Sequence, residues 1–375
     1  MQQRKVIFLT TGLAYGGAET QLVNLATRLK KRGWDVRVVS MLPPQAFTEE
    51  LAAAGIPLAT LNMRRGVPDP RAVFKMVKIL RQWWPHIIHS HMVHANLLAR
   101  VTRLFYRIPV VISTAHNINE GGRWREIAYR LTDFLTDLTT NVSRAAVDRY
   151  IKVGAVPKDK IIFMPNGIDT FRFQFNLNVR LQFRKDLKLN NNFTWLAVGR
   201  FEEAKDYPNL LQAFKRVADE RNDALLLIAG QGTLFEEIKG MAHSLGLTEK
   251  VRFLGVRRDV PELMSASDAY VMSSAWEGLP MVLLEAAACE LPIVATDVGG
   301  NSEIVLHEIN GYIVPPRDSE ALAAAMLKMM SLSEEERKAM GRAGRAHIEE
   351  NYSLDHVVDR WEKLYIELLK QKGIR

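Results

Sequence analysis

Two glutamates, Glu277 and Glu285, flank the start of a predicted helix in the stretch W-E-G-L-P-M-V-L-L-E-A-A-A-C-E, residues 276–290. Pro280 suits the first position of that helix, because its missing N–H would have no intrahelical partner there. The first backbone amides of the helix, together with its dipole, would then form a small site for a phosphate. Carboxylates do not bind phosphate, but they accept hydrogen bonds from sugar hydroxyls. Such a pocket suits a nucleotide-sugar; the alternative is a buried helix with one capping acid and one solvated acid.

A pair of basic residues occupies a second loop, G-R-F-E-E-A-K at residues 199–205, after a predicted strand at 195–198. Arg200 and Lys205 could clamp a diphosphate from this position. Salt bridges on the protein surface are the alternative. A further glycine turn, V-G-G-N-S-E at residues 298–303, leads into another helix with a polar cap.

The first predicted strand, Lys5–Thr10, runs into a glycine-rich turn at residues 12–17 and then a helix. This order is shared by several phosphate-binding folds. Ala18 and Glu19 stand where a P-loop requires Lys and Ser or Thr, which excludes a nucleotide triphosphatase. The G-x-G-x-x-G pattern is also absent, which argues against a nicotinamide enzyme. The turn is therefore predicted to let the backbone come close to a ligand.

Strands and helices alternate along the whole chain, which predicts a parallel α/β sheet with helices on both faces. Ligands of such sheets bind beyond the carboxyl ends of the strands. This places Gly16-Gly17, the cluster His89-Ser90-His91 and His116-Asn117 on one rim. A lone histidine is more often structural, but several on one rim favour a site.

The chain of 375 residues is long enough for two domains, and its 47% apolar and 25% charged content is typical of a globular protein. Cys289, the single cysteine, excludes an intrachain disulfide and fits a reducing cytosol. No apolar run approaches the ~18 residues of a membrane span. The apolar run at the start is too short for a signal peptide.

The formal charge of +8 is uneven along the chain. Residues 1–169 carry 24 lysines and arginines against 12 acids, whereas the remainder carries 26 against 30. Such asymmetry predicts a face that meets an anionic surface, either membrane or nucleic acid, and a generically basic surface is the alternative. Residues 100–107 and 123–125 interleave arginines with aromatic side chains, a pattern that fits a peripheral membrane face. A surface helix with snorkelling arginines is the alternative.

The predicted domains are an N-terminal, acceptor-side domain at 1–168 and a C-terminal, nucleotide-sugar-binding domain at 193–353. A polar linker is expected at 169–192, and the amphipathic last helix, 354–375, should pack back on the first domain. The fold class is two Rossmann-like parallel-sheet domains that face each other across a cleft. The predicted strands are 5–10, 35–41, 58–61, 87–89, 110–114, 139–142, 161–164, 195–198, 224–229, 251–254, 269–272 and 293–296. The predicted helices include 19–32, 70–83, 93–105, 125–138, 144–152, 207–220, 234–245 and 354–369.

Taken together, these motifs resemble the GT-B glycosyltransferases, specifically glycosyltransferase family 4, over essentially the whole chain. The most specific match is E-x7-E at Glu277 and Glu285. It is joined by G-R-F-x-x-x-K at 199–205, P-N-G-I-D at 165–169, G-G-A-E at 16–19 and G-G-N-S-E at 299–303.

The resemblance implies a role for each residue in a retaining transfer from a nucleotide-diphosphate sugar. Glu285 would bind the ribose hydroxyls and Glu277 a hydroxyl of the donor sugar, while Arg200 and Lys205 would neutralise the diphosphate. His116 matches a histidine that lies beside the transferred sugar in relatives. The implied catalytic residues are His116, Arg200, Lys205 and Glu277. The donor site would add Gly16, Gly17, Gly199, Gly278, Leu279, Met281, Val282 and Glu285, and the acceptor-side candidates are His91 and Asn117.

The sequence has no D-x-D, so no metal and no cofactor are expected beside a UDP- or GDP-linked donor. The implied acceptor is a glycan or a polyisoprenoid or other lipid-linked sugar of cell-surface polysaccharide or lipopolysaccharide synthesis. The enzyme would then be cytoplasmic and peripheral on the inner face of the plasma membrane, with no nucleic acid partner. The alternatives are a sugar-nucleotide epimerase of the same two-domain shape and a basic nucleic-acid-binding protein.

Overall fold

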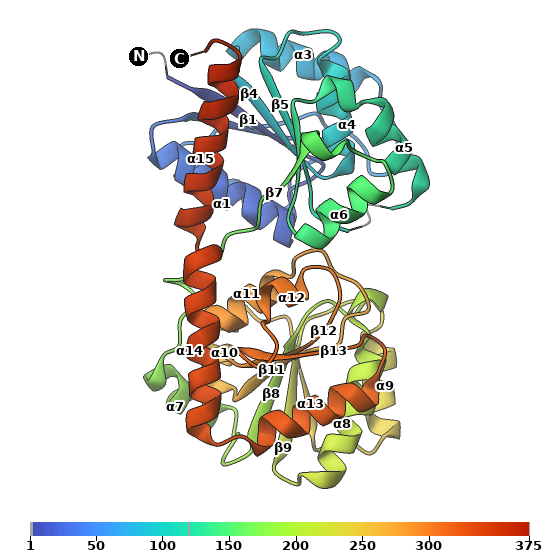
Figure 1. The fold of residues 1–375 in the computed structure, drawn as a ribbon, viewed down its shortest axis with the longest axis vertical. Helices are drawn as coiled ribbons and strands as arrows, with labels where there is room; N and C mark the ends of the chain where they lie inside the picture. Colours follow the sequence, from blue (N-terminus) through green and yellow to red (C-terminus); the bar gives the residue numbers. More distant parts are fainter. Residues whose placement is uncertain (1–2, 119–120, 375) are drawn as a thin grey trace. The chain divides into compact units, whose positions relative to one another are not determined.

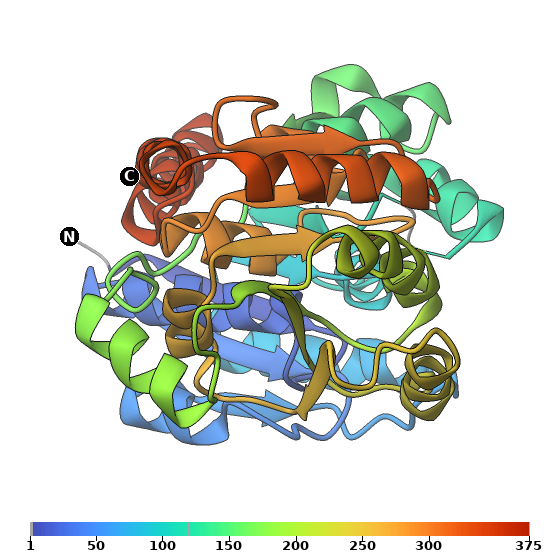
Figure 2. The same cartoon turned by 90° about the horizontal axis from the view of Figure 1, so that it is seen from below.

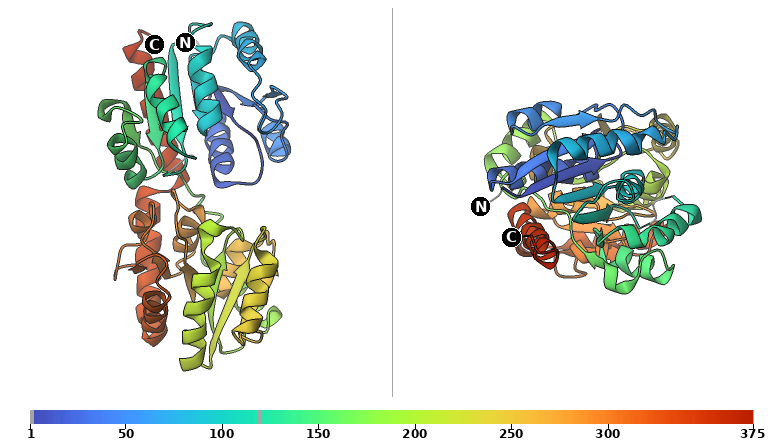
Figure 3. Two further views of the ribbon diagram at one scale, coloured as in Figure 1. Left: turned by 90° about the vertical axis from the view of Figure 1, so that its right-hand side faces the viewer. Right: turned by 90° about the horizontal axis from the view of Figure 1, so that it is seen from above.

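The computed structural model describes residues 3–118 and 121–374 and divides the chain into two α/β units. The first unit contains residues 1–167 and 354–375, and the second contains residues 168–353. Each unit has one parallel sheet with helices on both faces (Figures 1, 2 and 3). These two parallel-sheet domains confirm the predicted fold class.

The first unit has a seven-stranded sheet in the order β3-β2-β1-β4-β5-β6-β7. Side chains of a strand alternate between the two faces of its sheet. Val6 and Phe8 accordingly pack among residues of α1 and α15, whereas Ile7 and Leu9 pack among residues of α3 and α4. The strands are β1 (Lys5–Thr10), β2 (Asp35–Ser40), β3 (Leu58–Thr60), β4 (Ile87–His91), β5 (Val110–Ala115), β6 (Leu138–Asn141) and β7 (Ile161–Phe163). The helices are α1 (Gly17–Lys31), α2 (Thr48–Ala53), α3 (Arg71–Trp83), α4 (Val93–Thr102), α5 (Arg123–Leu131), α6 (Arg144–Lys152) and α15 (Leu354–Gln371), with 3-10 turns η1 (Asp133–Leu135) and η2 (Lys158–Lys160).

Helix α15 comes from the end of the chain and completes the core of the first unit. Its buried Trp361 and Tyr365 join the same apolar cluster as Leu22 and Leu29 of α1. The P-N-G-I-D turn is held beside these helices, because the Gln21 side chain donates to Gly167 O at 2.6 Å and accepts from Gly167 N at 2.8 Å.

The second unit has a six-stranded parallel sheet in the order β10-β9-β8-β11-β12-β13. One face packs on α8, α9 and α13, with Trp195 and Phe214 fully buried between them. The strands are β8 (Phe193–Val198), β9 (Ala224–Ala229), β10 (Val251–Gly255), β11 (Ala269–Met272), β12 (Ile293–Thr296) and β13 (Gly311–Val314). The helices are α7 (Leu177–Asp186), α8 (Tyr207–Glu220), α9 (Phe235–Ser244), α10 (Val260–Ala266), α11 (Met281–Ala288), α12 (Asn301–Ile304), α13 (Ser319–Ser331) and α14 (Glu334–Asn351), with a 3-10 turn η3 (Glu203–Lys205).

The segment 169–192, expected to be a linker, lies in the second unit and contains helix α7. Asp268 anchors this helix, because its carboxylate accepts from Arg180 at 2.5 Å and from Arg184 at 3.1 Å. The helix has no buried residue, so it lacks the apolar periodicity by which sequence reasoning finds helices.

Other predicted boundaries also differ from the structure. The predicted helix 125–138 is α5 followed by the turn η1, and the buried Thr136 lies between η1 and β6. Strand β4 continues to His91, two residues beyond its expected end, so His89 lies inside the sheet with no exposed surface.

In each sheet the chain adds strands first on one side of its first strand and then on the other side. In the first unit the chain builds β1, β2 and β3 to one side and then adds β4 on the other side of β1. In the second unit, β8 lies between β9 and β11 in the same way. Loops that follow the two central strands diverge at such a switch point and leave a crevice for a ligand.

Gly341 allows α14 to lie directly on the backbone of Glu290. A Cβ at Gly341 would be 2.0 Å from Glu290 O, whereas a Cβ at Gly240 in α9 would meet nothing within 4 Å. We expect Gly341→Ala to lower the free energy of unfolding by about 1–3 kcal/mol through overpacking. Gly240→Ala should instead raise it by about 0.5–1 kcal/mol, because alanine favours the helix. Urea unfolding followed by circular dichroism measures both, and equal effects would contradict the close approach.

Candidate functional site

Loops at the carboxyl ends of β8, β9, β11 and β12 meet at the switch point of the second unit. Ala275 N donates to Ala204 O at 2.8 Å, which joins the loops after β11 and β8. Gly300 N donates to Gly278 O at 2.7 Å, which joins the loops after β12 and β11. The motifs at 199–205, 277–285 and 299–303 are therefore adjacent within one unit, although the chain separates them widely.

Glycines make this contact between loops possible. Gly299 has φ +58°, and a Cβ there would be 2.3 Å from Glu277 O. A Cβ at Gly230, after β9, would be 1.9 Å from Gly199 O. Any larger residue at either position would push the loops apart.

Lys205 and Glu277 form an ion pair at the centre of these loops. Lys205 Nζ donates to Glu277 Oε1 at 2.6 Å, and Ser274 Oγ donates to the same oxygen at 2.7 Å. Only 19% of the lysine side chain and 14% of the glutamate side chain are exposed. An ammonium has three N–H donors and a carboxylate has a second oxygen. The pair can thus bind an anion through Lys205 and a hydroxyl group through Glu277.

Glu285 lies on α11, half-buried, eight positions after Glu277 in the chain. Burial raises the pKa of its carboxyl to about 7, although the positive charge of Arg172 acts in the opposite direction. The phenol of Tyr270, on β11, donates to Val198 O at 3.1 Å and accepts from Val198 N at 3.2 Å. Burial raises the pKa of Tyr270 well above its usual value, and the charges of both glutamates act in the same direction.

Pro280 is the N-cap residue of α11 and not its first helical residue, because the helix begins at Met281. The preceding residues, Gly278 and Leu279, are buried, and Met281 and Val282 are half-buried. The start of the helix thus lies directly after the loop that carries Glu277.

Arg200 does not share the position of Lys205. Its side chain is 76% exposed and lies 3.1 Å from Glu202 Oε1. The adjacent Gly199 is packed under Lys205 and Tyr207, and its carbonyl accepts from Tyr207 Oη at 3.1 Å. A joint action of the two cations on a diphosphate therefore stays a prediction.

In the first unit, His91 and His116 lie at the ends of the adjacent strands β4 and β5. His91 Nδ1 is 2.9 Å from His116 Nε2, and the rings are stacked with centroids 5.2 Å apart. Burial lowers the pKa of His116 to about 4 and the pKa of His91 well below its usual value. Both imidazoles are therefore neutral at physiological pH, and one donates to the other.

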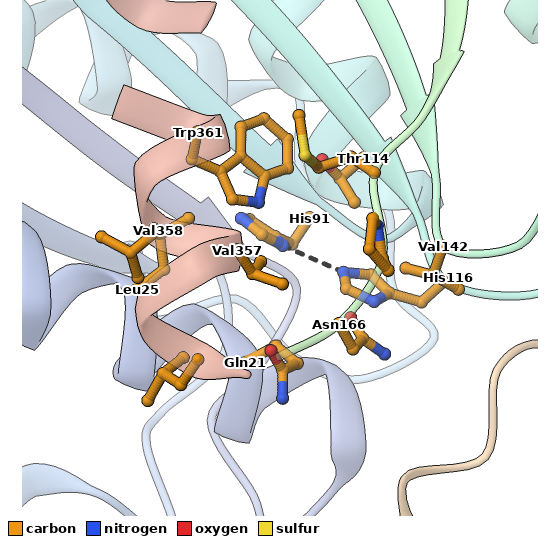
Figure 4. A pocket seen from close by; sticks show the side chains of 13 residues that line it. Gln21, Leu25, His91, Thr114, His116, Val142, Asn166, Val357, Val358 and Trp361 are labelled. Atoms are coloured by element: carbon orange, nitrogen blue, oxygen red, sulfur yellow. Dashed lines mark hydrogen bonds between the residues drawn. The ribbon is translucent and has the colours of Figure 1, made fainter. Parts of the chain in front are cut away.

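The two histidines line a pocket between α1, α15 and the P-N-G-I-D turn (Figure 4). The cavity volume is about 20 Å³, which is room for a single water molecule and not for a sugar. His89, on the same strand as His91, forms hydrogen bonds at both ring nitrogens. Its Nδ1 is 2.5 Å from Tyr365 Oη and its Nε2 is 2.6 Å from Thr114 Oγ1. His89 is therefore a satisfied core residue and not part of the predicted rim.

The other predicted residues of the first unit occupy loop positions. Gly16 is the extended N-cap of α1, Gly17 is its first helical residue, and both are exposed. A Cβ at Gly16 would be 2.6 Å from the Glu19 carboxylate. Asn117, also exposed, follows His116, and its carbonyl accepts from the Asn141 side chain at 3.4 Å.

Several residues of these two sites were not identified from the sequence. Tyr207, Tyr270 and Ser274 are common residue types with no motif around them. Only the order of the strands in the sheet shows that these three residues lie near the candidate site. Gln21 had one available signal, because it is a buried polar residue in the apolar periodicity of α1.

The predicted basic face at 100–107 is partly wrong. Arg100 is fully buried, where it donates to Ser113 Oγ at 3.1 Å and Thr139 Oγ1 at 2.9 Å. Arg103 points inward to Asp137, 2.9 Å away. A buried side chain cannot contact a membrane surface, so Arg100 is removed from that face.

Metal-binding clusters and membrane-spanning helices are both absent from residues 3–118 and 121–374. These residues contain no cluster of three or more His, Cys, Asp or Glu side chains suited to a metal ion. No helix among them has the length and apolar character needed to cross a bilayer.

Two family models match successive parts of the chain. The model for glycosyltransferase family 4 matches residues 15–172, and the model for glycosyl transferases group 1 matches residues 179–347. Each match falls largely within one structural unit.

Relatives and solved structures resemble the chain over most of its length. It is 26% identical to the UDP-Gal:alpha-D-GlcNAc-diphosphoundecaprenol alpha-1,3-galactosyltransferase of Escherichia coli, covering 82% of this chain and 81% of that protein. It is also 26% identical to the GDP-mannose-dependent alpha-(1-6)-phosphatidylinositol monomannoside mannosyltransferase of Mycobacterium tuberculosis, covering 94% and 93%. The crystal structure of HepE from Anabaena in complex with UDP superposes with a TM-score of 0.87 at 22% identity, covering 97% of this chain and 100% of that one.

The raised pKa of Glu285 predicts a pH-dependent stability. The folded protein holds this proton up to a pH of about 7, whereas the unfolded chain releases it near pH ~4.3. The contribution of Glu285 is therefore fully present at low pH and is lost as pH rises through about 7. Glu285→Gln should remove this loss, which is at most ~4 kcal/mol. Urea unfolding between pH 5 and 8 compares the two proteins, and parallel pH profiles would contradict the assignment.

Proposed function

Since the chain belongs to the glycosyltransferases of group 1 and family 4, which makes it a nucleotide-sugar glycosyltransferase, we propose that it transfers a sugar with retained configuration to a hydroxyl group of a lipid-linked or glycan acceptor. The observation that carries the site assignment is the contact between Lys205 and Glu277 at 2.6 Å. It joins an anion-binding group to a hydroxyl-binding group at the switch point of the second unit. A sugar bonded to a diphosphate needs both.

In the proposed donor site, the carboxylates bind hydroxyls and the cation binds phosphate. Glu277 accepts from a hydroxyl of the donor sugar, and Glu285 accepts from the ribose. A bound ribose favours the ionised form of Glu285, because only the carboxylate has all its oxygen lone pairs available as acceptors. The diphosphate is surrounded by Lys205, Arg200, Gly199 and the backbone amides of Gly278, Leu279, Met281 and Val282.

The proposed reaction breaks the bond between the anomeric carbon and the diphosphate oxygen. Positive charge develops on the carbon and negative charge on the departing diphosphate, which the nearby cations and amides stabilise. The acceptor oxygen then bonds to the same face of the sugar, and a phosphate oxygen takes its proton. No atom in this scheme requires a metal, because Lys205 and Arg200 supply the positive charge.

His116 and Gly16-Gly17 are proposed to act from the first unit. A neutral His116 can exchange a hydrogen bond with a hydroxyl of the transferred sugar without adding a charge. His91 would orient it, because their ring nitrogens are 2.9 Å apart. Asn117 and His91 remain acceptor-side candidates.

The relatives suggest the class of acceptor. One is named for a diphosphoundecaprenol acceptor and another for a phosphatidylinositol mannoside. Both names describe a sugar on a lipid, so we propose a lipid-linked acceptor and a role at a membrane surface. The same two names support UDP- and GDP-linked sugars as candidate donors.

The test of this function is nucleotide release with a panel of UDP- and GDP-sugars in EDTA, with and without lipid-linked saccharides. We expect one donor–acceptor pair to release nucleotide diphosphate and to give a product with the anomeric configuration of the donor. Loss of activity in EDTA with rescue by magnesium would contradict the metal-free scheme. An altered donor sugar without acceptor would indicate an epimerase instead.

Lys205→Met tests the ion pair. The variant keeps the length of the side chain but loses its charge, so we expect kcat to fall about 10²- to 10³-fold. The Kd for the donor should change less, since Glu285 and the amides remain. Lys215→Met is the matched control, because Lys215 pairs with Asp219 on the exposed face of α8. A wild-type kcat in the Lys205 variant would remove this residue from the mechanism.

A further inference from the structure

Helix α5 of the first unit presents an exposed stripe of apolar side chains. Trp124, Ile127 and Leu131 lie on α5 and Phe134 on the following turn η1, at intervals of three, four and three residues. The spacing of the first three residues places them on one side of α5, and Phe134 follows on the turn. Their exposed fractions are 83%, 36%, 68% and 72%. We refer to these four residues as the α5 stripe.

The opposite side of α5 fixes the helix to the unit. Tyr129 is its one buried residue, and its hydroxyl accepts from Asn96 at 2.6 Å. Glu126 pairs with Arg149 of α6 at 2.5 Å. Helix α5 is thus oriented by contacts behind it, and the stripe is held outward. The helix lies beside α4 and α6 at the edge of the unit (Figure 1).

Basic side chains border the α5 stripe. Arg123 and Arg130 are exposed on α5 itself, and the guanidinium of Arg130 reaches the turn after α6, 4.0 Å from a Cβ at Gly154. That turn is flanked by the exposed Lys152 and Lys158.

Most acids near the stripe are neutralised by partners. Asp133 is buried and lies 3.1 Å from Lys160, and Asp137 contacts both Arg103 and Lys372. Among the described residues of α5, α6, η1 and η2, Asp148 and Asp159 are the exposed acids. The border of the stripe is therefore predominantly positive.

An apolar stripe with an aromatic end and a basic border fits an anionic lipid surface. A helix of this kind lies in the interface with its apolar face in the headgroup region, and tryptophan favours that depth. Each basic residue near an anionic leaflet adds about 1 kcal/mol. A protein partner would also cover the stripe, but the basic border favours a negatively charged surface.

We propose that the α5 stripe docks the first unit on an anionic membrane surface. This inference rests on the proposed function, because it gives a reason for a lipid-linked acceptor to reach the enzyme. Helix α5 begins seven residues after His116, so docking would hold the end of the first unit that carries His116 close to the lipid headgroups.

The test is co-sedimentation of the full chain with vesicles at low salt. One set contains phosphatidylcholine with one third phosphatidylglycerol, and the other contains phosphatidylcholine alone. We expect binding to the first set, with Leu131→Asp lowering the partition coefficient about tenfold or more. Arg130→Gln should lower it about five-fold, and the loss should grow smaller as salt is added.

Leu181→Asp is the matched control, because Leu181 is a leucine with 62% exposure on helix α7 of the second unit. It should bind vesicles as the wild type does. Equal loss in both aspartate variants, or no wild-type binding to anionic vesicles, would overturn the proposal. It would also be overturned if Leu131→Asp instead converted a dimer to a monomer, which would assign the stripe to a second copy of the chain.

Donor binding provides the readout that separates the two proposals. A thermal shift with the nucleotide-sugar should be the same in Leu131→Asp and in the wild type. If vesicle binding holds while no nucleotide-sugar raises the Tm, the proposed function fails and the docking surface stands. If the donor binds and vesicles do not, the docking surface alone is wrong.

Discussion

The site in each unit depends on one constraint, the reversal of strand order in a parallel sheet. Because β8 lies between β9 and β11, the loops that follow β8 and β11 are neighbours although Lys205 and Glu277 are 72 residues apart. The same reversal between β1 and β4 brings the glycine turn of Gly16 and the end of β4 to one edge of the first sheet. Ligands of parallel α/β sheets bind at such edges, beyond the carboxyl ends of the strands.

Close packing of the loops then determines which chemistry the second unit can perform. Glycines at 230 and 299 let the backbone of one loop touch the next, which leaves Lys205 and Glu277 partly removed from water. An ion pair in such a position contributes little to stability, because desolvation offsets much of its attraction. Its more direct consequence is a fixed geometry, with a cation and an acceptor held 2.6 Å apart before any ligand arrives.

Much of this arrangement could be predicted from the sequence, and the exceptions have physical reasons. Buried parallel strands such as Ala224–Ala229 are continuous apolar runs, so the alternation of strands and helices, and the loops that follow the strands, could be predicted. Helix α7 was missed because it is held by arginines on Asp268 rather than by an apolar face. Arg100 was misassigned because buried hydroxyl groups accept hydrogen bonds from its guanidinium. These hydroxyls lie on strands β5 and β6, far from Arg100 in the sequence. The pairing of Lys205 with Glu277 also required the strand order.

The candidate site residues of the two units differ in charge, and this difference suits the proposed transfer. The second unit presents formal charges, whereas His91 and His116 in the first unit are kept neutral by burial. A protonated histidine beside the reacting sugar would repel the positive charge that develops on the anomeric carbon. A neutral imidazole can position a hydroxyl without that penalty. In the proposed transfer, burial of the histidine pair under α15 would therefore act through the charge that it removes, and the ion pair of the second unit through the charge that it keeps.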